Sequence, residues 1–217
     1  MKAQTILTIF FSTFIVLTFP IFGLAQEATK VKLPAPKING GKPLMQTLNE
    51  RKTSREFSPK PISDQTLSNL LWAAFGVNRP DGRRTAPSAK NMQEIDIYVA
   101  KSDGVYVYDA YENTLKIVIK EDLRALTGAQ PFVKDAPINL IYVADLSKMK
   151  GLSSENINLY SAADTGFISE NVYLFCASEG LATVIRGSVG RAALSKALGF
   201  GPDKKIILAQ TVGYPKE

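Results

Sequence analysis

The stretch RKTSREF at residues 51–57, followed by RTAPSAKNMQ at residues 84–93, says more about this chain than any other part of it. The first segment places three cations, Arg51, Lys52 and Arg55, beside two hydroxyl side chains. This density of charge and hydrogen-bond donors suits one dianionic phosphate, provided that the backbone turns the side chains the same way. The segment therefore indicates a site for a ligand that carries a phosphate group.

The second segment, residues 84–93, supplies a loop of small side chains. Pro87, Ser88 and Ala89 predict a stiff turn with little bulk, which lets a flat ring approach the backbone closely. Ser88 and Asn91 offer hydrogen bonds to the edge of such a ring. The two segments together suit a ligand that combines a phosphate with a planar ring.

Each segment also has a plainer interpretation. Residues 44–51, LMQTLNER, are expected to form a short helix, and cations at its end complement the helix dipole without binding a ligand. The loop at 84–93 can equally be an ordinary surface connection in front of a strand. Taken one at a time, the two segments leave these alternatives open.

In this order and spacing, the segments resemble the FMN-dependent nitroreductase family. That family carries an early Arg-x-Ser/Thr-x-Arg-x-Phe segment, an amphipathic helix, and a Pro-Ser-x-x-Asn-x-Gln loop that opens into a strand. The matching parts here are residues 51–57, the helix near 64–75 and residues 87–93. A third match is EGLATVIRGSVGR at residues 179–191, and the resemblance extends to IILAQTVGYP near the end of the chain.

The resemblance implies a homodimer with FMN at the subunit interface, so that each site takes residues from both subunits. The group implied to bind the phosphate and ribityl chain is Arg51, Lys52 and Thr53. The group implied to line the flavin from the other subunit is Pro87, Ser88, Ala89 and Asn91. The group implied to present a backbone N–H to flavin N5 is Ile185, Arg186 and Gly187. The charge of Arg186 is further expected to lie by the ring, because fixed donors and cations stabilise negative charge there.

The implied activity is that of an FMN-dependent oxidoreductase. It passes hydride or electrons from a reduced donor, commonly NAD(P)H, to an electron-poor acceptor such as a nitroaromatic or a quinone, by a ping-pong scheme. The flavin N5 carries the hydride, so no side chain is assigned a catalytic role. Two alternatives remain open: an exported flavin-binding module without turnover, and a flavin dehydrogenase that acts on another substrate.

The chain departs from the family pattern in three places. Lys90 stands where the family usually has Gly before the loop Asn, and Glu94 stands where it usually has Pro after the loop Gln. The chain also stops at Glu217, short of the C-terminal segment of many members. The phosphate is then expected to rely on Arg51, Lys52 or Arg191.

Composition excludes several other classes of chemistry. The chain has no histidine, which removes Ser/His and Cys/His catalysis and the usual imidazole metal ligands. Its single cysteine, Cys176, cannot form an intramolecular disulfide and is predicted to be a small core residue. Clustered carboxylates with ligand spacing are lacking, so no metal is expected. The net charge of +6 comes without aromatic–basic interleaving, so no nucleic-acid partner is expected.

The N-terminus predicts export. Residues 1–25 contain Lys2, an apolar run to Leu24 and small residues before Gln26, the pattern of a secretory signal cleaved after Ala25. We therefore expect a periplasmic or extracellular protein without a stable membrane span. An uncleaved anchor is the alternative, since the run approaches the ~20 residues that span a bilayer. An exported enzyme does not meet the cytosolic NAD(P)H pool, so a quinol, thiol or protein donor is an alternative electron source.

Hydrophobic periodicity predicts an α+β domain over residues 44–217, preceded by an extended, Pro- and Gly-rich leader at 26–43. Segment 148–160 is expected to be a surface loop. Strands are expected at 95–100, 104–110, 114–120, 138–144, 181–185 and 205–213. Helices are expected at 64–75, 162–178 and 191–198. This mixture, without strict βαβ alternation, favours a central, mostly antiparallel sheet packed between helices.

Overall fold

Strand β5 (Ile138–Asp145) lies in the middle of the molecule because its side chains are apolar on both faces. In the computed structural model, which describes residues 30–216, seven of its eight residues are buried. It pairs with β2 (Ile95–Lys101) on one side and with β7 (Lys204–Gly213) on the other. A continuous apolar run is therefore a central strand here, as predicted.

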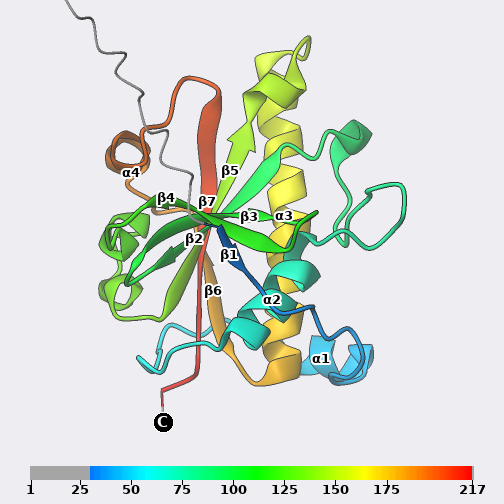
Figure 1. Cartoon of the computed structure of the whole chain (residues 1–217), viewed down its shortest axis with the longest axis vertical. Coiled ribbons are helices and arrows are strands. Elements are labelled where there is room, and N and C mark those ends of the chain that lie inside the picture. Colours follow the sequence, from blue (N-terminus) through cyan, green and yellow to red (C-terminus); the bar gives the residue numbers. More distant parts are fainter. Residues whose placement is uncertain (1–29, 217) are drawn as a thin grey trace, which may run out of the picture.

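The remaining strands extend the sheet on both sides (Figure 1). They are β1 (Lys30–Lys32), β3 (Gly104–Asp109), β4 (Thr114–Ile119) and β6 (Ala182–Arg186). The order across the seven-stranded sheet is β1-β4-β3-β2-β5-β7-β6, and each neighbouring pair is antiparallel. β6 thus forms one edge of the sheet, which matters for the site described below.

Helices cover both faces of this sheet. The α-helices are α1 (Leu44–Glu50), α2 (Asp64–Phe75), α3 (Ser154–Glu179) and α4 (Arg191–Ala197). Short 3-10 turns are η1 (Ala89–Asn91), η2 (Arg124–Thr127), η3 (Pro131–Lys134) and η4 (Leu146–Met149). The expected α+β class, an antiparallel sheet between helices, is confirmed.

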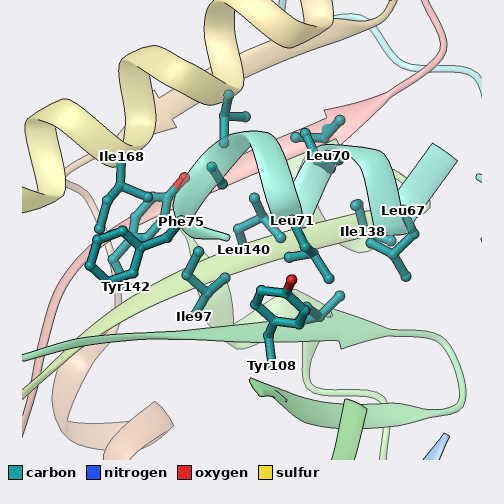
Figure 2. Packing of buried hydrophobic residues seen from close by; sticks show 14 of the residues in the cluster. Leu67, Leu70, Leu71, Phe75, Ile97, Tyr108, Ile138, Leu140, Tyr142 and Ile168 are labelled. Atoms are coloured by element: carbon teal, nitrogen blue, oxygen red, sulfur yellow. The ribbon is translucent and has the colours of Figure 1, made fainter. Parts of the chain in front are cut away.

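The main hydrophobic core lies between the sheet and the pair α2 and α3. Figure 2 shows Leu67, Leu71 and Phe75 of α2 pointing toward the sheet, with Ile168 of α3 beside them. A second core lies on the opposite face, where Leu194 in α4 is fully buried. Burial of each side chain of this size stabilises the folded state by about 1.5–3 kcal/mol.

Helix α2 is bounded as its sequence predicts. The hydroxyl of Ser63 accepts a hydrogen bond from the N–H of Thr66, which caps the helix. At the other end Gly76 adopts extended backbone, and a Cβ there would lie 2.4 Å from Cδ1 of Trp72. Glycine is therefore required by close packing against the indole and not by a left-handed turn.

Helix α3 is longer than predicted. It begins at Ser154, eight residues before the predicted start at Ala162, and Ser153 caps it by accepting from the N–H of Asn156. The predicted surface loop at 148–160 is wrong for the same reason, since most of it is the first turns of α3. The early turns are exposed and largely polar, so their sequence lacks the apolar stripe that marks a buried helix.

The leader joins the domain directly. The signal-like residues 1–25 lie outside the described chain, but from residue 30 the leader is extended and adds β1 to β4. The carbonyl of Pro34 accepts hydrogen bonds from Ser68 Oγ and from Asn113 Nδ2. No helix within residues 30–216 is long and apolar enough to cross a membrane.

The leader contacts generate a stability prediction. Ser68→Ala removes the buried hydroxyl that bonds the leader, and we expect it to lower the free energy of unfolding by about 1–3 kcal/mol, because the Pro34 carbonyl loses a partner. Urea titration measures the change. Ser102→Ala, in an exposed turn, is the control and should leave the free energy within about 0.5 kcal/mol. Equal stability of both variants would contradict a structural role for the leader.

Candidate functional site

The first predicted segment, residues 51–57, leaves α1 and runs alongside the start of β6. The N–H of Ser54 donates to the carbonyl of Thr183, 3.0 Å away, which ties the segment to that strand. Lys52 and Thr53 are exposed. The cationic and hydroxyl side chains of this segment therefore remain accessible to a ligand.

Tyr173 of α3 links this segment to the third predicted group. Its hydroxyl lies 3.1 Å from Oγ1 of Thr53 and accepts a hydrogen bond of 3.0 Å from the N–H of Ile185. The guanidinium of Arg51 lies over its ring, 5.4 Å from the ring centre. Sequence reasoning missed Tyr173, because a tyrosine within an apolar helix is ordinary and its distant contacts leave no local signal.

The edge position of β6 leaves one backbone donor open. The N–H groups of an edge strand point alternately toward and away from the neighbouring strand. The N–H of Ile185 points to Tyr173, away from β7. Gly187 lies in the bend that follows β6, it is exposed, and its N–H has no backbone partner within residues 30–216. Arg191 supports this turn by donating to the carbonyl of Gly187.

The hydrogen-bond donors of Arg191 are used in holding this turn. Its guanidinium also donates to the carbonyls of Ile206 and Ile207, at 3.0 and 2.6 Å. These bonds tie the turn after β6 to β7. The expectation that Arg191 substitutes for a missing phosphate ligand is therefore not supported by the placement of its side chain.

The side chain of Arg186, whose charge is expected to lie by the flavin ring, points into the protein interior. Its side chain is 5% exposed and donates to the Thr127 carbonyl at 2.6 Å and to Oδ1 of Asn139 at 2.8 Å. No carboxylate pairs with it among residues 30–216, and burial lowers its pKa to about 10. A Cβ on Gly128 would lie 1.8 Å from its Nη1, so that glycine makes room for it. Alternation along β6 turns this side chain inward.

A cavity of about 550 Å³ lies beside the first segment. Lys52, Ser54 and Tyr173 line it, together with Lys216 at the end of the described chain. A slightly larger cavity, of about 600 Å³, lies between the leader, α2 and α3, and Trp72 lines it. Only the smaller one touches the cationic segment.

The second predicted group forms a tightly held loop in front of β2. The N–H of Ala89 donates to Oδ2 of Asp164 on α3, and the N–H of Gln93 donates to the Ser88 hydroxyl. That hydroxyl also lies 3.3 Å from Oε2 of Glu94, so it faces the protein interior. Pro87 and Asn91 are exposed and Ala89 is half-buried. The loop thus offers Pro87, Ala89 and Asn91 to a ligand more readily than the Ser88 hydroxyl.

The first and second groups do not meet within one subunit. Each is anchored on α3, the first at Tyr173 and the second at Asp164. Nine residues of α-helix span about 14 Å and two and a half turns, so the two anchors lie on opposite margins of the buried face. The two groups are therefore held at separate places along one helix.

Part of the exposed surface of α1 and α3 is apolar. On α3 it contains Leu159 and Phe167, which are 60% and 49% exposed. On α1 it contains Leu44, Met45 and Leu48. Exposed apolar side chains of this size can mark a surface that another protein chain covers.

Comparison with known proteins shows which family has this architecture. The model of the nitroreductase family matches residues 48–214. A protein named as a nitroreductase from Methanocaldococcus jannaschii is 31% identical over 155 residues, which cover 67% of this chain and 78% of that protein. A crystal structure described as a nitroreductase from Ralstonia eutropha is 41% identical, with a TM-score of 0.84 over 89% of this chain and 93% of that chain.

A third relative bears a more specific name. The FMN reductase [NAD(P)H] of Bacillus subtilis is 23% identical over 159 residues, and the match covers 73% of this chain but only 53% of that protein. The family match covers nearly all of the described domain, including the cationic segment, the tight loop and β6. The chain is therefore an oxidoreductase of the nitroreductase family.

Proposed function

We propose that this protein is an FMN-dependent oxidoreductase that passes hydride or electrons from a reduced donor to an electron-poor acceptor, such as a nitroaromatic or a quinone, by a ping-pong scheme. The observation that carries the proposal is the position of Tyr173. It joins the cationic segment after α1 to the edge strand β6, beside a cavity of about 550 Å³. A phosphate and a planar ring can then be bound by one connected framework.

The residues present fit FMN. Arg51 and Lys52 suit its phosphate, because they are cations on a segment that two hydrogen bonds hold in place. Thr53 suits the ribityl chain, since its hydroxyl is exposed beside Tyr173. The open N–H of Gly187 suits flavin N5, while Ile185 contributes structure through its bond to Tyr173.

Bound FMN supplies the redox chemistry of both half-reactions. The part left to the protein is to orient the ring, to exclude water and to stabilise negative charge with fixed donors. Arg186 contributes to that stabilisation only through space, as a buried cation that lacks a carboxylate partner among the described residues. No side chain is required as a nucleophile, and burial raises the pKa of the Cys176 thiol, which keeps it unreactive.

A homodimer completes the site in this proposal. The loop with Pro87, Ala89 and Asn91 of one subunit faces the cationic segment of the other, which accounts for two half-sites that lie about 14 Å apart along α3. The exposed apolar surface on α1 and α3 supports the same arrangement, because a second copy would remove it from water. The Ser88 hydroxyl stabilises this loop through hydrogen bonds to Gln93 and Glu94.

The electron donor follows from two considerations that point in different directions. The names of the Bacillus subtilis relative and of the NADPH:FMN oxidoreductase from Vibrio harveyi, which has the same fold at 19% identity, favour NAD(P)H. The signal-like sequence at residues 1–25 supports an exported protein, for which a quinol, thiol or protein donor is more accessible. A bound flavin that NAD(P)H does not reduce would favour the alternatives of a binding module or a dehydrogenase for another substrate.

The visible spectrum of the purified protein, residues 26–217, tests the function. We expect a flavin absorption band that is retained through dialysis and bleaches on anaerobic addition of NADH or NADPH. Recovery of the band on addition of a quinone would demonstrate the second half-reaction. A flavin band that persists after this addition would show that the electron donor is not a nicotinamide. Failure to bind added FMN would overturn the proposal.

Arg51→Ala tests the phosphate assignment. Loss of a charge-assisted hydrogen bond is worth roughly 1.5–3 kcal/mol, so we expect the Kd for FMN to rise by about tenfold to a hundredfold. The Kd for riboflavin, which lacks the phosphate, should change by less than about twofold. Arg83→Ala, an exposed arginine in the 79–84 turn, is the matched control. An equal loss of affinity for FMN and for riboflavin would show that Arg51 does not bind the phosphate.

Phe167→Arg tests the dimer. A charge at this exposed apolar position of α3 should be costly to bury, so we expect a monomer in analytical ultracentrifugation and a loss of bound FMN. Leu126→Arg introduces the same charge at an exposed apolar residue of η2 and should leave a dimer. A dimeric, flavin-bound Phe167→Arg protein would place the subunit interface elsewhere.

A further inference from the structure

Two buried carboxyl groups lie behind the loop at residues 87–93. Glu94 is 0% exposed and Asp164 is 2% exposed, and neither forms an ion pair within residues 30–216. They come from different elements, the end of the loop and α3, and they contact adjacent residues of the loop. Oε2 of Glu94 lies 3.3 Å from the Ser88 hydroxyl, and Oδ2 of Asp164 accepts from the N–H of Ala89. Two adjacent buried carboxylates without counterions are costly, so such a pair normally keeps one proton.

The loop in front of them is strained. Lys90, Asn91 and Gln93 all have positive φ, at 52°, 54° and 49°, although none is glycine. Left-handed backbone at such residues costs free energy and persists only when neighbouring contacts enforce it. The acid pair supplies two of these contacts, because Asp164 accepts from the N–H of Ala89 and Glu94 faces the Ser88 hydroxyl.

The hydrogen bonds around Glu94 involve one of its two oxygens and leave the other without a partner among the described residues. Ser88 Oγ accepts from the N–H of Gln93, so its own hydrogen is free to be donated to Oε2 of Glu94. The other oxygen, Oε1, is buried and has no hydrogen-bond partner when the group is treated as a carboxylate. A proton on Oε1 turns this oxygen from an acceptor without a partner into a donor, and Asp164 is the carboxylate whose charge acts on Glu94.

We propose that Glu94 is a positioning residue, held in its protonated form by Asp164, and that this neutral acid fixes the strained loop that lines the cofactor. Loss of the proton puts a second negative charge into the buried pair and loosens the contacts that hold residues 88–93. The protonated pair is a property of this chain alone. Only its effect on cofactor binding rests on the proposed function.

The neighbouring charges do not neutralise the pair. Arg84 donates to Oε1 of Gln93 and Lys148 donates to the Gln93 carbonyl, so both cations bind the loop and not the acids. Asp96, the next acid along β2, is paired with Lys148 and Lys204. Burial, followed by the charge of Asp164, raises the pKa of Glu94.

The direction of the pH effect follows from that shift. A carboxyl group with a raised pKa in the folded protein stabilises fully below its unfolded pKa, and this stabilisation is lost as the pH rises through the folded pKa. The loop should therefore be best ordered at a pH below the folded pKa of Glu94. Binding of FMN should weaken by up to about tenfold per pH unit above the folded pKa.

Infrared spectroscopy of the cofactor-free protein tests the proton. We expect the C=O band of one protonated carboxyl group to persist, as the pH is raised, after the exposed carboxyl groups have ionised. This band should be absent from Glu94→Gln and retained in Glu121→Gln, which changes an exposed glutamate. In Asp164→Asn the band should disappear at a lower pH, because one cause of the raised pKa is removed. A band that is unchanged in Glu94→Gln, or missing from the wild type, would overturn the proposal.

The pH dependence of FMN binding tests the coupling. Glu94→Gln is an isostere of the protonated acid, since its amide can donate to Asp164 and accept from Ser88. We expect its Kd for FMN to match that of the wild type at low pH and to stay flat where the wild-type Kd rises. Parallel pH profiles would refute the coupling. Lack of FMN binding by both proteins would overturn the proposed function instead, while the infrared band would still decide whether Glu94 carries the proton.

Discussion

The packing of α3 against the sheet is the constraint on which the rest of the structure depends. Its inner face, with Ile168, Val172 and Cys176, is buried in the main core, so neither its position nor its rotation is free. Because a helix has a fixed rise and twist, the margins of that buried face are fixed as well. Asp164 on one margin and Tyr173 on the other then hold two loops that have little structure of their own.

Hydrogen bonds, more than ion pairs, hold the segments of the candidate site, and those of Arg186 are buried. Tyr173 binds two segments through one hydroxyl, Arg191 satisfies three carbonyls, and Arg186 is surrounded by Thr127 and Asn139. Such networks are stronger in a low-dielectric interior than on the surface, and they are intolerant of a missing partner. This arrangement suits a protein whose redox chemistry is supplied by a bound group, since its own task is to hold donors at fixed places.

Much of this fold could be predicted from local patterns. The bounds of α2 and the limits of β2 to β5 agree with the predictions to within a residue, because capping by Ser63 and alternating or continuous apolar runs are local signals. The start of α3 could not be predicted, because its first turns face water and lack a stripe. Strand β1 could not be predicted either, since its three exposed residues form a strand only through pairing with β4.

The sequence by itself determined the family, the antiparallel α+β class and the segments that carry the candidate site, because motif order, spacing and periodicity are properties of the chain. Tertiary structure decided what each side chain does. In the folded chain Arg186 points into the interior, and the N–H of Ile185 donates to Tyr173. Glu94 lies near Asp164, which is seventy residues away along the chain. Contacts over such separations depend on how rigid elements pack, and no local pattern records that packing.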